Sequence, residues 1–241
     1  MIADEPRPTP AVGTPDATVL NADAFHREIV AFIGRELPVW RDRPTRPPLT
    51  DEPNLNQTLC VHLNSASRRQ CFDAVQFLQE PLQSSARRGD IGVMPLGLIV
   101  VEGRTYDDFE QLLPIECKRL PTPPDNRRSD LEYVHGLPGH RTGAIERFKH
   151  GLHGRSNRRA LIIGYVQTES FQYWLSVINA RLALLAKNGT DGGHWNPAEL
   201  LSRATGSPDT NVDKLISTHG RLVPPCCSSP VEIEHIWLRM N

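Results

Sequence analysis

"PIECKRL", residues 114–120, combines the pattern of a β-strand with two charged side chains. Side chains on a strand alternate between its two faces, so Glu116 and Lys118 share one face. Ile115 and Cys117 share the other face, which predicts that this side of the strand packs on a core. The charged face is either an exposed ion pair, which contributes ~0.2–1 kcal/mol, or the two halves of a catalytic site.

Further strand and helix patterns surround this stretch. Apolar runs with β-branched and aromatic residues predict strands over residues 71–79, 91–94, 98–102, 112–120, 160–167, 215–223 and 231–240. Apolar residues at helical spacing predict helices over residues 21–37, 51–66, 143–152 and 170–189. Because helices and strands are interleaved, we expect an α/β (α+β) fold with a mixed central β-sheet flanked by helices.

Composition divides the chain into a short N-terminal part and one larger domain. Residues 1–18 are rich in proline and poor in large apolar residues, which predicts a disordered tail. Residues 19–48 predict a helix and a linker, and the linker starts at Pro38 because proline interrupts helices. Residues 49–241 are long enough to form one sizeable core.

Composition also limits the compartment. No apolar run approaches the ~20 residues that a membrane span needs, and the N-terminus lacks the basic and apolar regions of a secretory signal. The five cysteines are an odd set without a CxxC pair, which argues against a disulfide framework. We therefore expect a cytoplasmic protein with no membrane partner.

Basic residues are concentrated in one segment of a chain whose formal net charge is −1. The segment from Lys118 to Arg159 holds ten basic and four acidic residues, a net charge of +6. A local basic patch is typical of a surface that binds a phosphate backbone, and a solvated loop is the alternative. The candidate nucleic-acid contacts are Arg119, Arg147, Lys149 and Arg155.

A second acid, outside the charged strand, completes the pattern. Asp90 stands just before the predicted strand at 91–94, although an aspartate after glycine is also typical of a turn. Two carboxylates from adjacent strands can hold Mg²⁺ or Mn²⁺, since these hard ions take oxygen ligands, and the Cys117 carbonyl offers another oxygen. A bound ion activates a water and polarises a phosphate, while Lys118 beside Glu116 can neutralise developing charge. The pattern therefore predicts a metal-dependent phosphodiesterase.

Zinc is the alternative metal. Four histidines cluster in the sequence, namely His135, His140, His150 and His153. The spacing of the last two is possible for zinc, but no cysteine lies near them and no HExxH motif is present, so the sequence disfavours a zinc site. His219 and His235 fall in strand patterns, where we expect structural, hydrogen-bonded histidines.

"GDIGV" and "PIECKRL" together resemble the core of the PD-(D/E)XK nuclease superfamily, which has the restriction-endonuclease-like fold. A longer ordered series, from about residue 50 to the C-terminus, resembles a group of bacterial proteins of this superfamily that is associated with anti-phage defence operons. The series comprises TDEPNLNQTLCVHL, DIGV, IECK, GAIERFKHGL, LIIGYVQ, STHGRL and EIEHIWLRM.

The resemblance implies a mixed sheet with Asp90 and Glu116 as metal ligands and Lys118 as the catalytic lysine. Superfamily members often add an acid from the first core helix, and Glu52 matches that position. An acid in the first turn of a helix is also common without any catalytic role. One departure is Gly89, which stands where the name of the superfamily has proline.

The resemblance also implies a polar residue on the helix after the E-x-K strand, a role that Arg147 or Lys149 can fill. The resulting hypothesis is a Mg²⁺-dependent endonuclease that hydrolyses DNA, as the effector subunit of an anti-phage defence complex. The alternative is a catalytically inactive nuclease-fold subunit that binds nucleic acid or docks onto a larger defence assembly. Protein partners are expected under both hypotheses, and self-association is left open.

Overall fold

The structure is a computed structural model that describes residues 18–20, 22–81, 89–101, 103–125, 129–189, 195–204, 210–222 and 229–241. Its main sheet has seven strands in the order β2-β3-β6-β7-β10-β9-β8. These strands are β2 (Val75–Gln79), β3 (Ile91–Pro95), β6 (Leu113–Leu120), β7 (Arg159–Val166), β8 (Ser202–Arg203), β9 (Val212–His219) and β10 (Val231–Arg239). The helices of the described residues are α1 (Ala22–Arg41), α2 (Glu52–Arg69), α3 (Ala144–Lys149) and α4 (Phe171–Asn188).

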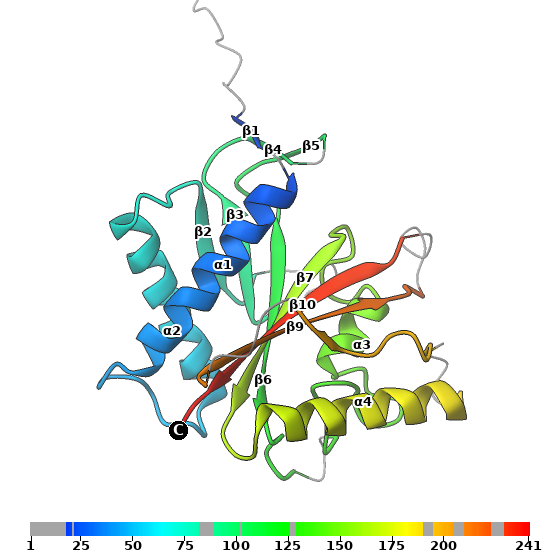
Figure 1. Ribbon diagram of the computed structural model, residues 1–241. Coiled ribbons are helices and arrows are strands. Elements are labelled where there is room, and N and C mark those ends of the chain that lie inside the picture. Colours follow the sequence, from blue (N-terminus) through cyan, green and yellow to red (C-terminus); the bar gives the residue numbers. More distant parts are fainter. Residues whose placement is uncertain are drawn as a thin grey trace, which may run out of the picture.

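The helices form two layers, one on each face of the sheet (Figure 1). α1 and α2 cover one face, where Ile33 and Ile115 belong to the same core. α3 and α4 cover the other face, where Ile178 and Ile162 belong to a second core. The predicted α+β class, with a mixed sheet flanked by helices, is confirmed.

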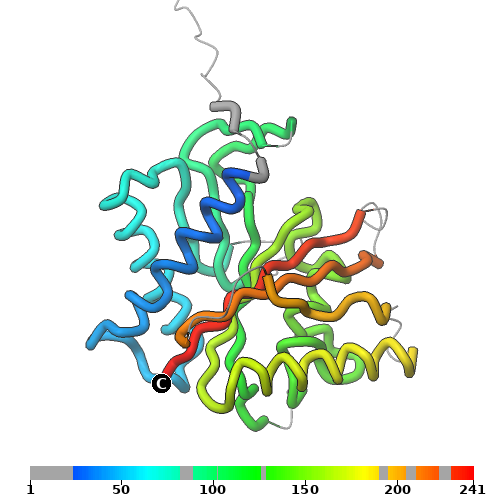
Figure 2. Tube along the Cα trace, in the orientation of Figure 1, coloured from blue at the N-terminus to red at the C-terminus, as the bar shows by residue number. Residues whose placement is uncertain are grey.

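The "PIECKRL" stretch lies in β6, the third strand of the sheet. β6 runs antiparallel to β3, with Ile115 opposite Ile91, and parallel to β7 from Ile115 to Leu120. Figure 2 shows that β10, the last strand of the chain, runs through the centre of the molecule. There it pairs in parallel with β7 and antiparallel with β9.

α1 is part of the main core. The ring of Phe32 stacks on the rings of Phe72 and Phe77, with centroids 4.9 Å and 6.0 Å apart. The predicted end of this helix at residue 37 is wrong, because α1 continues through Pro38 to Arg41. Trp40 explains the continuation, since it is buried and completes the packing of α1 on the sheet. Residues 19–48 and 49–241 therefore share a core, while residues 1–17 of the predicted tail lie outside the described residues.

The predicted strand at 98–102 lies outside the main sheet. It is β4 (Ile99–Val101), which pairs with β1 (Thr18–Leu20) and β5 (Arg104–Tyr106) in a small three-stranded sheet. The sequence did not predict β1, β5 or β8, since each has only two or three residues and too little periodicity to detect. Among the described residues, none of the helices has the length and apolar character that crossing a bilayer requires.

Candidate active site

The structure brings Asp90, Glu116 and Lys118 together at the middle of β6. The ammonium Nζ of Lys118 lies 3.5 Å from Glu116 Oε2 and 3.8 Å from Asp90 Oδ2. Glu116 and Lys118 share one face of β6, whereas Asp90 comes from the turn before β3. The lysine therefore links two carboxylates that are distant in the sequence.

Asp90 takes the place of a strand partner at the edge of β6. Its Oδ2 accepts a hydrogen bond of 2.7 Å from the Cys117 N–H, beyond the point at Ile115 where the β3 register ends. The N–H and C=O of one strand residue point to the same side, so the Cys117 carbonyl faces this edge too. The Asp90 side chain is 24% exposed, so the edge is open to solvent.

Glu116 is buried, and both of its carboxylate oxygens have partners. Arg147 on α3 donates from Nη1 to Oε2 at 2.9 Å, and His153 Nδ1 contacts Oε1. The segment after α3 turns back toward β6 at Gly154, which has a φ of 56°. A Cβ at this position would lie 2.6 Å from Pro114, so glycine permits the close approach that brings His153 to Glu116.

The two carboxylates have opposite pKa shifts. Burial opposes the ionisation of Glu116, but the charges of Lys118, His153 and Arg147 outweigh it and hold the pKa well below its ordinary value. Burial and the negative charge of Glu116 raise the pKa of Asp90 to about 6. Burial also disfavours the Lys118 ammonium, but Asp90 and Glu116 together raise its pKa. Paired acids whose pKa values are pushed apart are typical of catalytic sites.

Glu52, in the first turn of α2, lies beside this cluster. Its negative charge contributes to the raised pKa of both Asp90 and Lys118. Its Oε2 lies 3.5 Å from Nε of Arg119, which also donates to the Leu49 carbonyl at 3.2 Å. Glu52 is thus near the acidic pair, whereas Arg119 is held by neighbouring protein groups.

The predicted basic surface is divided by α3. Lys149 is fully buried with Nζ 2.7 Å from both oxygens of Glu199, so the predicted nucleic-acid contact is incompatible with its position. The reason is geometric, because residues two apart on a helix point about 200° apart. α3 therefore directs Arg147 to the site and Lys149 away from it, while Arg155 lies exposed beyond the helix.

The four clustered histidines have separate environments. His135 Nε2 lies 2.7 Å from Arg181 Nη1, His153 contacts Glu116, His150 is buried at the end of α3, and His140 is exposed. In the sequence, His153 was a candidate only for a zinc site, and its contact with Glu116 was not predicted. The available signal was "HGLHG", in which glycines follow a short basic helix and turn the chain back.

The oxygens at the site match the chemistry of Mg²⁺ or Mn²⁺. They are the carboxylates of Asp90 and Glu116 and the carbonyl of Cys117, which are hard donors. Within the described ranges, no group of three or more His, Cys, Asp or Glu side chains is arranged to hold a metal ion. The donor types thus fit such an ion, but Glu116 is paired with Arg147 and His153, so the ion requires one of these contacts to open.

The site is defined by its geometry, because the comparisons with known proteins found no match. The chain matches no protein-family model, no curated protein and no solved structure. The fold and the site define an α+β protein in which a glutamate and a lysine of one central strand meet an aspartate from the turn before a neighbouring strand. The resemblance to the PD-(D/E)XK superfamily stays a prediction.

Proposed function

We propose that this protein is a Mg²⁺- or Mn²⁺-dependent nuclease with a restriction-endonuclease-like core that hydrolyses phosphodiester bonds of DNA. One observation carries the proposal: the Lys118 ammonium lies 3.5 Å from the carboxylate of Glu116 on β6 and 3.8 Å from that of Asp90 in the turn before β3. Two acids can hold a hard cation, and the ammonium beside them can stabilise negative charge on a phosphate.

Each residue of the cluster has a role in this reaction. When bound at Asp90 and Glu116, the ion would polarise the phosphoryl oxygen and activate a water. Lys118 stays protonated because its pKa is raised, so it offers a full positive charge to the phosphate. Asp90 accepts the Cys117 N–H, which holds its carboxylate at the open edge of β6. Glu52 adds negative charge that favours cations at this edge.

Two arginines, one on α3 and one in the segment after it, support the proposed substrate. Arg155 is exposed, and the Arg147 side chain is 24% exposed although it contacts Glu116. Guanidinium groups bind phosphates with two parallel hydrogen bonds, which suits a nucleic-acid backbone. We assign these two arginines to the backbone of DNA and leave out the buried Lys149.

The cellular role rests on the resemblance of the ordered motifs. On that basis the protein is a cytoplasmic effector subunit of an anti-phage defence complex, with protein partners. The alternative is a catalytically inactive nuclease-fold subunit that binds nucleic acid or docks onto a larger assembly. That alternative is favoured by one observation, the pairing of both Glu116 oxygens with Arg147 and His153.

Cleavage assays with matched variants test the proposal. We expect cleavage of plasmid or linear DNA with Mg²⁺ or Mn²⁺ but not with EDTA, and a loss of at least about 100-fold in Glu116→Gln and Lys118→Met. The controls are Glu232→Gln, with a side chain that is 43% exposed, and Lys187→Met at the exposed end of α4. Equal cleavage by all variants would refute the site, and a folded protein that binds DNA without cutting it favours the inactive subunit.

A further inference from the structure

α3 carries two basic side chains that reach in opposite directions. Arg147 donates to Glu116 at 2.9 Å, and Lys149 lies 2.7 Å from both oxygens of Glu199. The ring of Trp195 covers the Lys149 ammonium at 4.9 Å. Both side chains come from one helix of six residues, so a movement of the whole helix that releases Arg147 would also displace the second ion pair.

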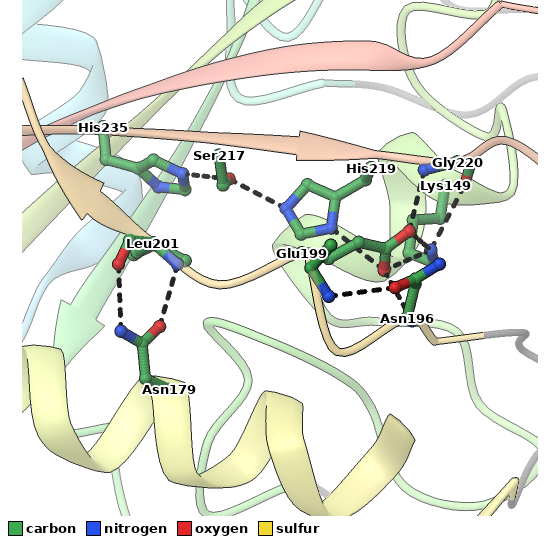
Figure 3. A network of polar contacts seen from close by, with 10 residues as sticks. Lys149, Asn179, Asn196, Glu199, Leu201, Ser217, His219, Gly220 and His235 are labelled. Carbon is green, nitrogen blue, oxygen red and sulfur yellow. Dashed lines mark hydrogen bonds and ion pairs between the residues drawn. The ribbon is translucent and has the colours of Figure 1, made fainter. Parts of the chain in front are cut away.

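The second ion pair is part of a network of polar contacts with β9, α4 and the segment that carries Glu199 (Figure 3). The Glu199 carboxylate accepts the backbone N–H of Gly220 at 2.8 Å, and His219 Nδ1 lies 3.4 Å from it. Asn179 of α4 fixes the segment that carries Glu199, since its carboxamide bonds both the N–H and the C=O of Leu201 at 2.9 Å. Lys149 of α3 and the end of β9 thus hold the carboxylate itself, and α4 holds the segment that carries it.

A buried chain of hydrogen bonds continues from His219 into the sheet. His219 Nε2 lies 2.8 Å from Ser217 Oγ, which lies 2.8 Å from His235 Nε2. His235 Nδ1 lies 2.7 Å from the Tyr133 hydroxyl, which accepts the Trp237 indole N–H at 2.8 Å. All five residues are buried, so no water competes for these bonds.

One direction of donation satisfies every group of this chain. An indole N–H only donates, which leaves the single hydrogen of the Tyr133 hydroxyl for His235 Nδ1. Burial lowers the pKa of His235 and keeps it neutral, so it donates from Nε2 to Ser217. Ser217 then donates to His219, and this leaves the Nδ1–H of His219 facing Glu199. The chain therefore orients His219 toward the carboxylate that holds Lys149.

We propose that α3 is a clamp that controls the access of a divalent cation to Glu116. Arg147 occupies the carboxylate from one face of the helix, and the Lys149–Glu199 pair holds the helix in place from the other. The clamp rests on the proposed function, which assigns Glu116 to the cation. Arg147 and the cation compete for the same oxygen, and the anchored Glu199 opposes the movement that would free it. Lys149 and Glu199 are thus positioning residues.

Binding of Mn²⁺ alone to the full chain, without nucleic acid, tests the competition. We expect calorimetry to give a Kd at least roughly tenfold lower for Arg147→Gln than for the wild type, because a positive charge leaves a poorly solvated site. Arg141→Gln, at an exposed arginine before α3, is the matched control and keeps the Kd within about twofold because solvent screens its charge. A Kd for Arg147→Gln that equals or exceeds the wild-type value overturns the clamp.

A double variant tests the positioning role. Lys149→Met with Glu199→Leu removes both charges together, so neither is left buried without its partner. We expect the double variant to bind Mn²⁺ more tightly than the wild type. In a protein that already carries Arg147→Gln, we expect the same two substitutions to lower the Kd no further. Lys187→Met, at an exposed lysine of α4, is the control. An unchanged Kd in the double variant, or effects that add fully, overturns the positioning role.

Cation binding also separates this inference from the nuclease proposal. DNA cleavage by the wild type, with equal Mn²⁺ affinity in Arg147→Gln, overturns the clamp and keeps the nuclease. Tighter Mn²⁺ binding by Arg147→Gln in a protein that cleaves no DNA supports the clamp and refutes the nuclease. Absence of Mn²⁺ binding in both proteins overturns both.

Discussion

Glu116 and Glu199 are buried glutamates on opposite sides of α3, and each is paired with a basic residue of that helix. The Glu199 carboxylate has a lysine, a histidine and backbone N–H groups around it. Glu116 has only side-chain partners, and one of them, Lys118, also faces the partly exposed Asp90.

The difference shows what separates a structural carboxylate from one that is suited to a ligand. Backbone N–H groups cannot leave Glu199 without unfolding the segments that carry them, so its contacts are fixed. Arg147 holds Glu116 through side-chain atoms alone, so a displacement of α3 exposes an oxygen to a cation while the backbone of β6 stays in place. Asp90, an acid whose pKa is raised, lies beside Glu116. The contacts of Glu199 described above include no second acid of this kind. Burial alone therefore does not identify the site.

The largest expected effect comes from removing the basic side chain of α3 that pairs with each glutamate. Lys149→Met should lower the free energy of unfolding by about 3–5 kcal/mol, because it leaves Glu199 charged and buried. Arg147→Met should lower it by only about 0–1 kcal/mol, because the arginine is partly exposed and Glu116 keeps Lys118 and His153.

Urea denaturation at pH 7 measures both values. Adding Glu199→Leu to Lys149→Met serves as the control, and it should restore most of the lost stability because no unpaired charge remains. Equal losses in the two single variants would mean that the two glutamates do not differ in the way we describe.

The next prediction is a gain in the free energy of unfolding rather than a loss. Burial and Glu116 raise the pKa of Asp90 from 3.8 to about 6, so the folded protein binds this proton more tightly than the unfolded chain does. The resulting stability is present below pH 3.8 and is lost as the pH rises through about 6. Asp90→Asn should therefore stabilise the protein by roughly 1–3 kcal/mol at pH 8 in EDTA, and by almost nothing at pH 3.5.

Denaturation curves at both pH values check this result. Asp130→Asn is the control, because Arg181 lowers the pKa of Asp130 and its side chain is 77% exposed. That variant should be neutral or slightly destabilising at pH 8. A loss of stability in Asp90→Asn at pH 8 would show that Asp90 is a structural acid like Glu199.

The strand of the site could be predicted because its signal is local. Alternation along β6 placed Glu116 and Lys118 on one face, and the long apolar run of β7 predicted a further strand. The approach of Asp90 was expected from the turn before β3 together with the resemblance. The strand patterns depend on residues within single elements, so the sequence contains them directly, whereas the approach of Asp90 to β6 needed the resemblance.

The burial of Lys149 could not be predicted, because its partner is distant and irregular. Glu199 lies 50 residues later, outside any helix or strand, and no local pattern connects the two. In a basic segment a lysine is expected at the surface, since an unpaired buried charge is costly. The contact of His153 with Glu116 escaped prediction for the same reason, as it depends on how the turn after α3 meets β6.

The smallest effect concerns the hydrogen-bond chain behind Glu199. Ser217→Ala leaves His235 Nε2–H and His219 Nε2 without their shared partner, so we expect a loss of about 1–2 kcal/mol in the free energy of unfolding. Ser176→Ala, at an exposed position of α4, is the matched control. Among the described residues its hydroxyl bonds the Gln172 carbonyl of its own helix, so the variant should change stability by less than about 0.5 kcal/mol. If the two alanine variants lose the same stability, the chain adds nothing to the anchoring of Glu199, and the two glutamates are distinguished by their nearest partners alone.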